Sequence, residues 1–138
     1  MLYSSIRATT LAFFAQLTDN IAMKREADRW YSMALRDERI HVQYLFHRQP
    51  APEDIYAPLM LIYYELIRPT ATRGWMKHLI GAMKLLELRG SENCQTSVSH
   101  LFFNALRLFT VFHSILDLHS RRLIHICSRR VCPSPVAE

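Results

Sequence analysis

Apolar residues recur every three or four positions through most of the chain, which is the spacing of an amphipathic helix. Prolines and an Asp-Asn pair separate the periodic stretches. The predicted helices cover residues 3–18, 21–47, 53–68, 74–90 and, after a polar loop at 91–97, residues 97 to about 118, with an end at Ile126 as the alternative. The sequence shows no apolar-polar alternation of the kind that predicts strands. The pattern therefore predicts an all-α protein, an antiparallel helical bundle or hairpin array of about five helices.

Local features refine three of these helices. Asp19-Asn20 is a natural break and can cap the second helix, whose many charged residues we expect to form a solvated face laced with pairs one turn apart. The third helix is apolar almost all round, which predicts a central position in the bundle. Pro52 suits the first turn of this helix, whereas Pro58 predicts either a helix that starts near it or a kink there.

The amino-acid totals agree with a single helical domain. The chain has 138 residues, of which 50% are hydrophobic, and this is enough for a substantial core. Only three glycines are present, fewer than the turns of an all-β fold need. The formal net charge of +5 suits nucleic acid, an acidic partner or an anionic membrane, but an ordinary basic surface explains it at least as well.

We expect no membrane span, no secretory signal and a reducing compartment. The most apolar stretch, residues 101–118, carries Arg107 and Asp117, and each charge at the bilayer centre costs about 2.5–3.5 kcal/mol. The first residues lack a basic segment followed by a continuous apolar run. The three cysteines are odd in number and show no CxxC spacing, which argues against a disulfide framework and a cysteine-built zinc site.

Candidate chemistry is sparse along the chain. His113, His119 and His125 recur every six residues, a step that turns them to different sides of a helix, and HExxH is absent. The sequence has neither GxSxG nor a glycine-rich phosphate loop, and Cys94 has no histidine near it in sequence. Helix capping or a solvated surface explains the two adjacent pairs of acidic residues best. We therefore predict a protein that is not an enzyme and that uses no metal and no cofactor.

The stretch 74–90 is predicted to be a packing helix with glycine at each end. One face of the helical wheel holds Trp75, Leu79, Ala82 and Leu86, with Trp75 as the expected core anchor. His78 falls on the polar side of the same wheel. Gly81 costs about 1 kcal/mol against alanine inside a helix, so we expect another backbone to come close to it. Gly90 is placed as a C′ glycine that ends the helix.

Four ordered motifs resemble the regulatory region of fungal zinc-cluster transcription factors. The most specific one spells Trp75-x-x-His78-x-x-Gly81-Ala82-x-x-Leu85-Leu86-x-x-Arg89-Gly90. The other three are Tyr31-Ser32-x-Ala34-Leu35, the apolar stretch 59–66 that ends in Tyr64-Glu65-Leu66, and Leu101-Phe102-x-x-Ala105-Leu106-Arg107. The ordered set is more specific than any single motif, and it covers roughly residues 5–120. Its signature positions, Trp75, His78, Gly81, Ala82, Leu86 and Gly90, are expected to be structural.

The resemblance implies an all-α regulatory domain of a nuclear transcription regulator, with protein partners or self-association and no membrane. The family's separate zinc cluster, which contacts DNA through six cysteines and two zinc ions, has no counterpart here. Direct nucleic-acid binding is therefore not expected, and the chain looks like a fragment, a truncated gene product or a degenerate relative. Without the resemblance, we would predict a cytoplasmic protein.

From the extent of this resemblance we predict a partial regulatory domain at residues 1–120 and a basic, poorly ordered tail at residues 121–138. The tail carries a basic patch of Arg121, Arg122, Arg129 and Arg130. Such a patch suits nuclear import or nucleic acid, although a solvated tail explains it at least as well. An alternative function is a free-standing helical adaptor that binds a partner helix through an apolar groove, which the Met-, Phe- and Tyr-rich apolar surface motivates.

Overall fold

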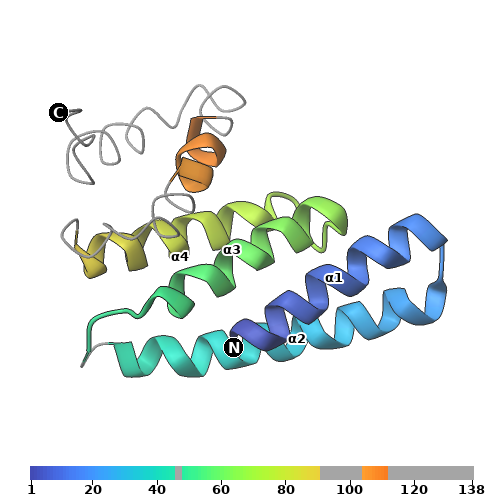
Figure 1. Ribbon diagram of the computed structural model, residues 1–138, viewed down its shortest axis with the longest axis horizontal. Coiled ribbons are helices and arrows are strands. Elements are labelled where there is room, and N and C mark those ends of the chain that lie inside the picture. The colour runs from blue at the N-terminus through green and yellow to red at the C-terminus, as the bar shows by residue number, and fades with distance from the viewer. Residues whose placement is uncertain (46–47, 91–103, 112–138) are drawn as a thin grey trace, which may run out of the picture.

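The computed structural model describes residues 1–45, 48–90 and 104–111. Its helices are α1 (Leu2–Thr18), α2 (Ile21–Tyr44), α3 (Pro52–Ile67) and α4 (Gly74–Arg89), and residues 104–111 are also helical. The chain turns back after each helix, so that α1 lies along α2 and α3 lies along α4 (Figure 1). The described ranges contain helices and no strand, which confirms the prediction of an all-α fold. Among these helices, none is long and apolar enough to cross a bilayer.

The break between α1 and α2 lies where the sequence predicts it. Asp19 follows α1 in a left-handed conformation with φ 48°. Asn20 then caps α2, because its Oδ1 accepts a hydrogen bond from the Met23 backbone N–H at 3.1 Å. Asp and Asn tolerate left-handed backbone and offer a side-chain acceptor, so the pair ends one helix and starts the next. At its other end α2 stops at Tyr44, slightly before the predicted residue 47.

Helix α3 continues through its internal proline. It begins at Pro52, so the alternative in which the helix starts near Pro58 is wrong. Asp54 closes the first turn: its Oδ2 accepts from the Ala51 N–H at 2.7 Å, and the Ala51 carbonyl accepts from the Asp54 N–H at 3.1 Å. This reciprocal pairing satisfies two backbone donors at the start of the helix.

The central position of α3 is visible in the two apolar clusters of the core. One cluster consists of Leu45, Ile55, Leu59, Ile62, Leu79, Ala82, Leu85, Leu86 and Leu106. The other consists of Ala8, Ala12, Ala27, Tyr31, Ala34, Leu61 and Tyr64. Helix α3 contributes to both, which explains why its sequence is apolar almost all round.

Helix α1 packs through small side chains. Its buried residues are Ser4, Ser5, Ala8, Ala12 and Ala15. Their size lets the α1 backbone approach α3, and Thr9 Oγ1 lies 2.8 Å from the carbonyl oxygen of Met60. Leu11 packs against the second core cluster from the border of this face, whereas Tyr3, Ile6, Phe13, Phe14 and Leu17 are exposed.

The expectation of a solvated charged face on α2 is wrong for Glu38, and Asp28 uses its half-exposed carboxylate in a contact between helices. Asp28 is turned toward α3, where Arg68 donates to both of its oxygens, from Nε at 2.9 Å and from Nη2 at 2.7 Å. Glu38 is turned toward α4 and keeps only 20% of its side chain exposed. The pair of Arg29 with Glu26 at 4.0 Å is of the expected surface kind. Part of the charge on α2 therefore serves contacts between helices.

The glycines of α4 differ in what they do. Gly90 ends the helix with φ 79°, as predicted for a C′ glycine. The prediction that Gly81 marks a close contact is wrong, because a Cβ added there would meet no atom of the described residues within 4 Å. The close contact is at Gly74, where a Cβ would lie less than 3.0 Å from all three atoms of the Glu65 carboxyl group. The start of α4 therefore has no room for a side chain.

Alanine at these two glycines should have opposite effects. Gly81→Ala should raise the free energy of unfolding by about 0.5–1 kcal/mol, because alanine favours the helix and finds free space. Gly74→Ala should lower it, because the new methyl group must displace a buried carboxyl group. Urea unfolding of the two variants measures both effects. Equal effects at the two positions would contradict the placement of α4 against Glu65.

Candidate functional site

Three polar side chains from three helices meet inside the protein. Tyr31 of α2 donates its hydroxyl hydrogen to Glu65 Oε1 of α3 at 2.5 Å, and Nε2 of His78, on α4, lies 3.1 Å from the same hydroxyl oxygen. All three residues are buried, with 7%, 2% and 8% of their surface exposed. We call Tyr31, Glu65 and His78 the buried polar cluster. It ties α2, α3 and α4 together at one point.

Glu65 also holds the connection between α3 and α4. Thr70 donates twice to its carboxylate, from the backbone N–H to Oε2 at 3.0 Å and from Oγ1 to Oε1 at 2.5 Å. Gly74 leaves space for the same carboxylate where α4 begins. A buried carboxylate needs such donors, because an unpaired one costs several kcal/mol. The connection between α3 and α4 therefore takes its conformation from contacts with the Glu65 side chain.

A stacked pair of tyrosines extends the contact between α2 and α3. The ring centroids of Tyr31 and Tyr64 lie 4.1 Å apart, with 9° between the ring planes. Each hydroxyl donates to a carboxylate on the other tyrosine's helix: Tyr31 to Glu65, and Tyr64 to Asp28 at 2.5 Å. Arg68 pairs with Asp28 from α3's C-terminal end. Because a slip of either helix would break both hydrogen bonds, this exchange fixes their register.

The hydrogen-bond pattern assigns the tautomer of His78. The hydroxyl group of Tyr31 has one hydrogen, which points to Glu65, so its oxygen acts as an acceptor toward His78. Nε2 of His78 therefore carries the ring hydrogen. Nδ1 faces Glu38 Oε2 at 3.8 Å, which is beyond hydrogen-bond distance.

Burial and hydrogen bonding hold the protons of the buried polar cluster in place. Burial works to raise the pKa of Glu65, but hydrogen bonds from Thr70 and Tyr31 outweigh it and hold that pKa below its usual value. Burial raises the pKa of Tyr31 well above its usual value, and the hydrogen bond to Glu65 adds to the rise. Burial lowers the pKa of His78, and this effect outweighs the negative charge of Glu65, which raises it. An ionised Glu65, a protonated Tyr31 and a neutral His78 suit fixed hydrogen bonds better than proton transfer.

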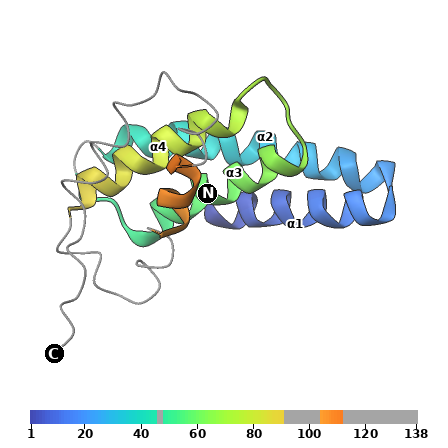
Figure 2. The ribbon, with the colours of Figure 1, turned by 90° about the horizontal axis from the view of Figure 1, so that it is seen from above.

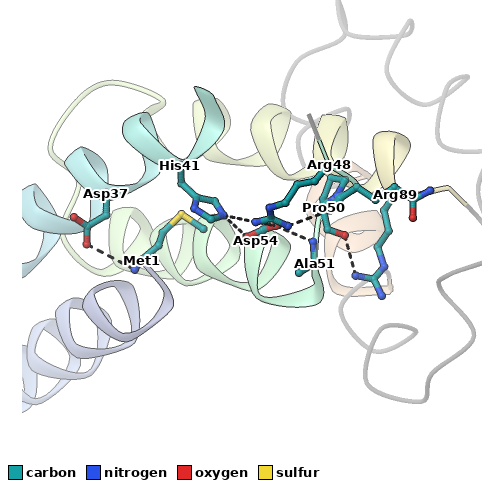
Figure 3. A network of polar contacts seen from close by, with 9 residues as sticks. Met1, Asp37, His41, Arg48, Pro50, Ala51, Asp54 and Arg89 are labelled. Carbon is teal, nitrogen blue, oxygen red and sulfur yellow. Dashed lines mark hydrogen bonds and ion pairs between the residues drawn. The ribbon is translucent and has the colours of Figure 1, made fainter. Parts of the chain in front are cut away.

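A second polar cluster joins the end of α2 to the start of α3 (Figure 3). His41 Nε2 lies 2.6 Å from Asp54 Oδ1, and Arg48 Nη2 lies 2.9 Å from Asp54 Oδ2. Arg89, at the end of α4, donates from Nη1 to the Pro50 carbonyl at 3.2 Å. These contacts hold the α2–α3 connection against the ends of both neighbouring helices.

An apolar hollow of about 550 Å³ lies beside the first turn of α4. Its lining consists of Tyr63, Leu66, Trp75, Ala105, Leu108 and Phe109. No member of the buried polar cluster belongs to this lining. The hollow therefore offers apolar contact area and is separate from the titratable groups described above.

The predicted signature positions occupy different environments. Ala82 and Leu86 are buried in the core, and Trp75, the expected core anchor, is only half-buried against it. His78 is a correction, because the helical wheel placed it on the polar side and it is buried against Tyr31. The wheel fails here because a partner on another helix satisfies the ring nitrogen. The predicted tail, residues 121–138, lies outside the described residues, and with it Arg121, Arg122, Arg129, Arg130 and His125. Cys94, His113 and His119 also lie outside them.

Sequence reasoning did not identify Tyr31, Glu65 and Thr70 as partners. Tyr31 and Glu65 were noted only as members of their motifs, with no role assigned to either side chain. A signal was nevertheless present, because three of the four motifs each bring one member of the buried polar cluster. A polar residue in an apolar stretch needs a buried partner, and the other motifs supply it.

A family model matches nearly the whole chain, from residue 2 to residue 126, and describes the fungal specific transcription factor domain. The chain belongs to this family. The resemblance predicted from the four motifs is thereby confirmed. No curated protein and no solved structure matches the sequence. The match includes α1 to α4, so the buried polar cluster lies within the fungal-specific transcription factor domain.

Glu38 should make the stability of this fungal-specific transcription factor domain depend on pH. Burial raises the pKa of Glu38 from 4.5 to about 7. The folded protein thus keeps a proton that the unfolded chain releases above pH 4.5. The stability that Glu38 contributes is therefore present below pH 4.5 and lost as the pH rises to about 7. The loss is at most about 3 kcal/mol.

The lowered pKa of His78 affects stability in the opposite direction: the stability that His78 contributes is present above pH 6.5 and is lost as the pH falls. The variant Glu38→Gln separates the effect of Glu38 from that of His78. Urea unfolding between pH 4.5 and about 7 should show the variant gaining stability relative to the wild type as the pH rises. Glu53→Gln, at an exposed acid of α3, is the matched control and should follow the wild type. A constant difference between Glu38→Gln and the wild type would contradict the burial of Glu38.

Proposed function

We propose that the chain is a non-catalytic regulatory domain of a fungal transcription regulator, acting in the nucleus through contacts with proteins. It does so without a DNA-binding zinc cluster of its own. Membership in the fungal-specific transcription factor domain family supplies the transcriptional context. The observation that carries the rest is the buried polar cluster, whose titratable groups are turned toward one another between helices.

The chemistry of the cluster supports a structural use of its polar residues. Hydrogen bonds from Thr70 and Tyr31 hold Glu65 in its ionised form, which makes it a weak base. The raised pKa of Tyr31 makes this residue a weak acid. The apolar hollow shares no lining residue with the cluster. The motif residues thus contribute to the fold, and the surface remains for contacts with partners.

The cysteine content and the surface support the choice of partner class. The family's zinc cluster uses six cysteines, and this chain has three without a CxxC spacing. Many large apolar side chains are exposed on the described surface, and such side chains favour protein contacts. Protein partners therefore fit this chain better than nucleic acid.

A tethered reporter assay tests the proposal. The chain is fused to an unrelated DNA-binding module and placed upstream of a reporter gene, with the module alone as the reference. We expect reporter output to differ several-fold from that of the module alone, in either direction. Lys84→Ala, at an exposed position of α4, should keep the effect, whereas Leu59→Asp, at a core position with 1% exposure, should abolish it.

The proposal fails if the fusion and the module alone give the same output across growth conditions while both are present in the nucleus at equal levels. It also fails if Leu59→Asp leaves the effect intact, because the effect would then not need the folded domain.

The second candidate is a helical adaptor that takes a partner helix into an apolar groove. The apolar hollow between α3, α4 and residues 104–111 favours it. The two candidates differ in the tethered assay, because an adaptor without a transcriptional role leaves the reporter unchanged. Leu66→Lys, in the lining of the hollow, should then be the variant that weakens binding of the partner helix.

A further inference from the structure

The outer face of α1 carries a stripe of apolar residues at the spacing of a coiled-coil seam. The stripe consists of Tyr3, Ile6, Thr10, Phe13 and Leu17, separated by three and four residues in turn. This is the a/d pattern of a heptad repeat. All five positions are exposed, and the four apolar ones keep 45–66% of their surface open. We call these five residues the α1 seam.

The α1 seam is the reverse side of the helix that packs into the bundle. The buried residues of α1 are alanines and serines on the opposite face. Figure 2 shows α1 at one edge of the bundle, with α2 and α3 on one side of it. Among the described elements, nothing therefore lies between the α1 seam and an approaching partner.

Local contacts hold two aromatic side chains of the seam, Tyr3 and Phe13, in place. The ring of Tyr3 meets Trp30 edge to face, with 5.8 Å between centroids, and Arg7 donates to the Tyr3 hydroxyl at 2.8 Å. The rings of Phe13 and Phe14 contact each other edge to face at 5.9 Å. Side chains fixed in advance lose less conformational entropy on binding.

The area of the α1 seam suits a modest interface. A fully buried aromatic side chain covers about 150–250 Å², so the half-open Tyr3 and Phe13 of the seam and Phe14 beside it together still expose about 300 Å². Ile6, Leu17 and the neighbouring Ile21 add to this patch. A stable interface covers about 800 Å² per partner, so the patch suits a reversible, concentration-dependent complex better than an obligate one.

The chemistry of the seam identifies the occupant. A heptad stripe is complementary to another helix with the same spacing. From residue 8 to residue 18, α1 has no charged side chain, so the partner must also be uncharged along its centre. α1 itself meets both requirements, and its exposed position lets two copies approach face to face. We propose that the chain self-associates through the α1 seam, with α1 of a second copy as the partner helix.

This inference names one protein partner of the domain and does not depend on a transcriptional role. Its test uses the full chain in analytical ultracentrifugation over a range of concentrations. We expect a reversible monomer–dimer equilibrium. Phe13→Glu places a charge in the seam and should weaken the dimer by about tenfold or more. Gln16→Glu adds the same charge at an exposed position of α1 off the seam and should leave the dimer unchanged.

Leu17→Glu repeats the test at the more exposed end of the seam, with circular dichroism to confirm that both variants remain helical. Thr10 is the midpoint of the seam, so full overlap of two seams in either direction brings the two copies of this residue together. Under a mild oxidant, Thr10→Cys should therefore cross-link two chains more than the wild type or Gln16→Cys does.

A chain that stays monomeric at the highest concentrations reached would overturn the proposal, and the stripe would then serve a different protein or none. A dimer that both glutamate variants leave intact would overturn the assignment to α1, as would equal cross-linking by Thr10→Cys and Gln16→Cys. These outcomes do not depend on the reporter assay, so self-association and transcriptional regulation are tested by separate experiments.

Discussion

The arrangement of α2, α3 and α4 depends on one buried carboxylate, Glu65. A charge that is 2% exposed is unfavourable unless donors surround it, and here the donors come from α2 and from the connection to α4. Tyr31 and Thr70 can reach Glu65 only when α2 lies against α3 and the connection folds back over the end of α3. Gly74 then lets α4 start directly beside the carboxylate. The hydrogen bonds that the Glu65 carboxylate needs therefore fix the positions of α2, α3 and α4.

The core of the protein is apolar, but some acidic side chains make contacts between helices and several large apolar side chains lie on the surface. Asp28, Glu38 and Glu65 face other helices, whereas Phe13 and Leu17 face solvent. The inward polar groups specify how the helices fit, because each must meet its partner. The outward apolar groups are free to contact other proteins.

Features with a local cause could be predicted from the sequence. The break at Asp19-Asn20, the first turn at Pro52 and the end at Gly90 depend on neighbouring residues, and the structure places them as expected. The roles of His78 and Gly81 could not be predicted, because they depend on what another helix brings to those positions. A helical wheel of α4 contains no information about Tyr31 of α2, whose hydroxyl oxygen is the hydrogen-bond partner of His78 Nε2. The motifs did contain the members of the site, but only the fold showed that they meet.

A double-mutant cycle on Tyr31 and Glu65 tests the central role of the buried carboxylate most directly. The free energy of unfolding is measured for Tyr31→Phe, Glu65→Gln and the double variant, with Glu53→Gln replacing Glu65→Gln in a control cycle. We expect a coupling energy of about 1–3 kcal/mol for Tyr31 with Glu65 and additive effects in the control cycle. Additivity within about 0.5 kcal/mol for Tyr31 with Glu65 would contradict this expectation.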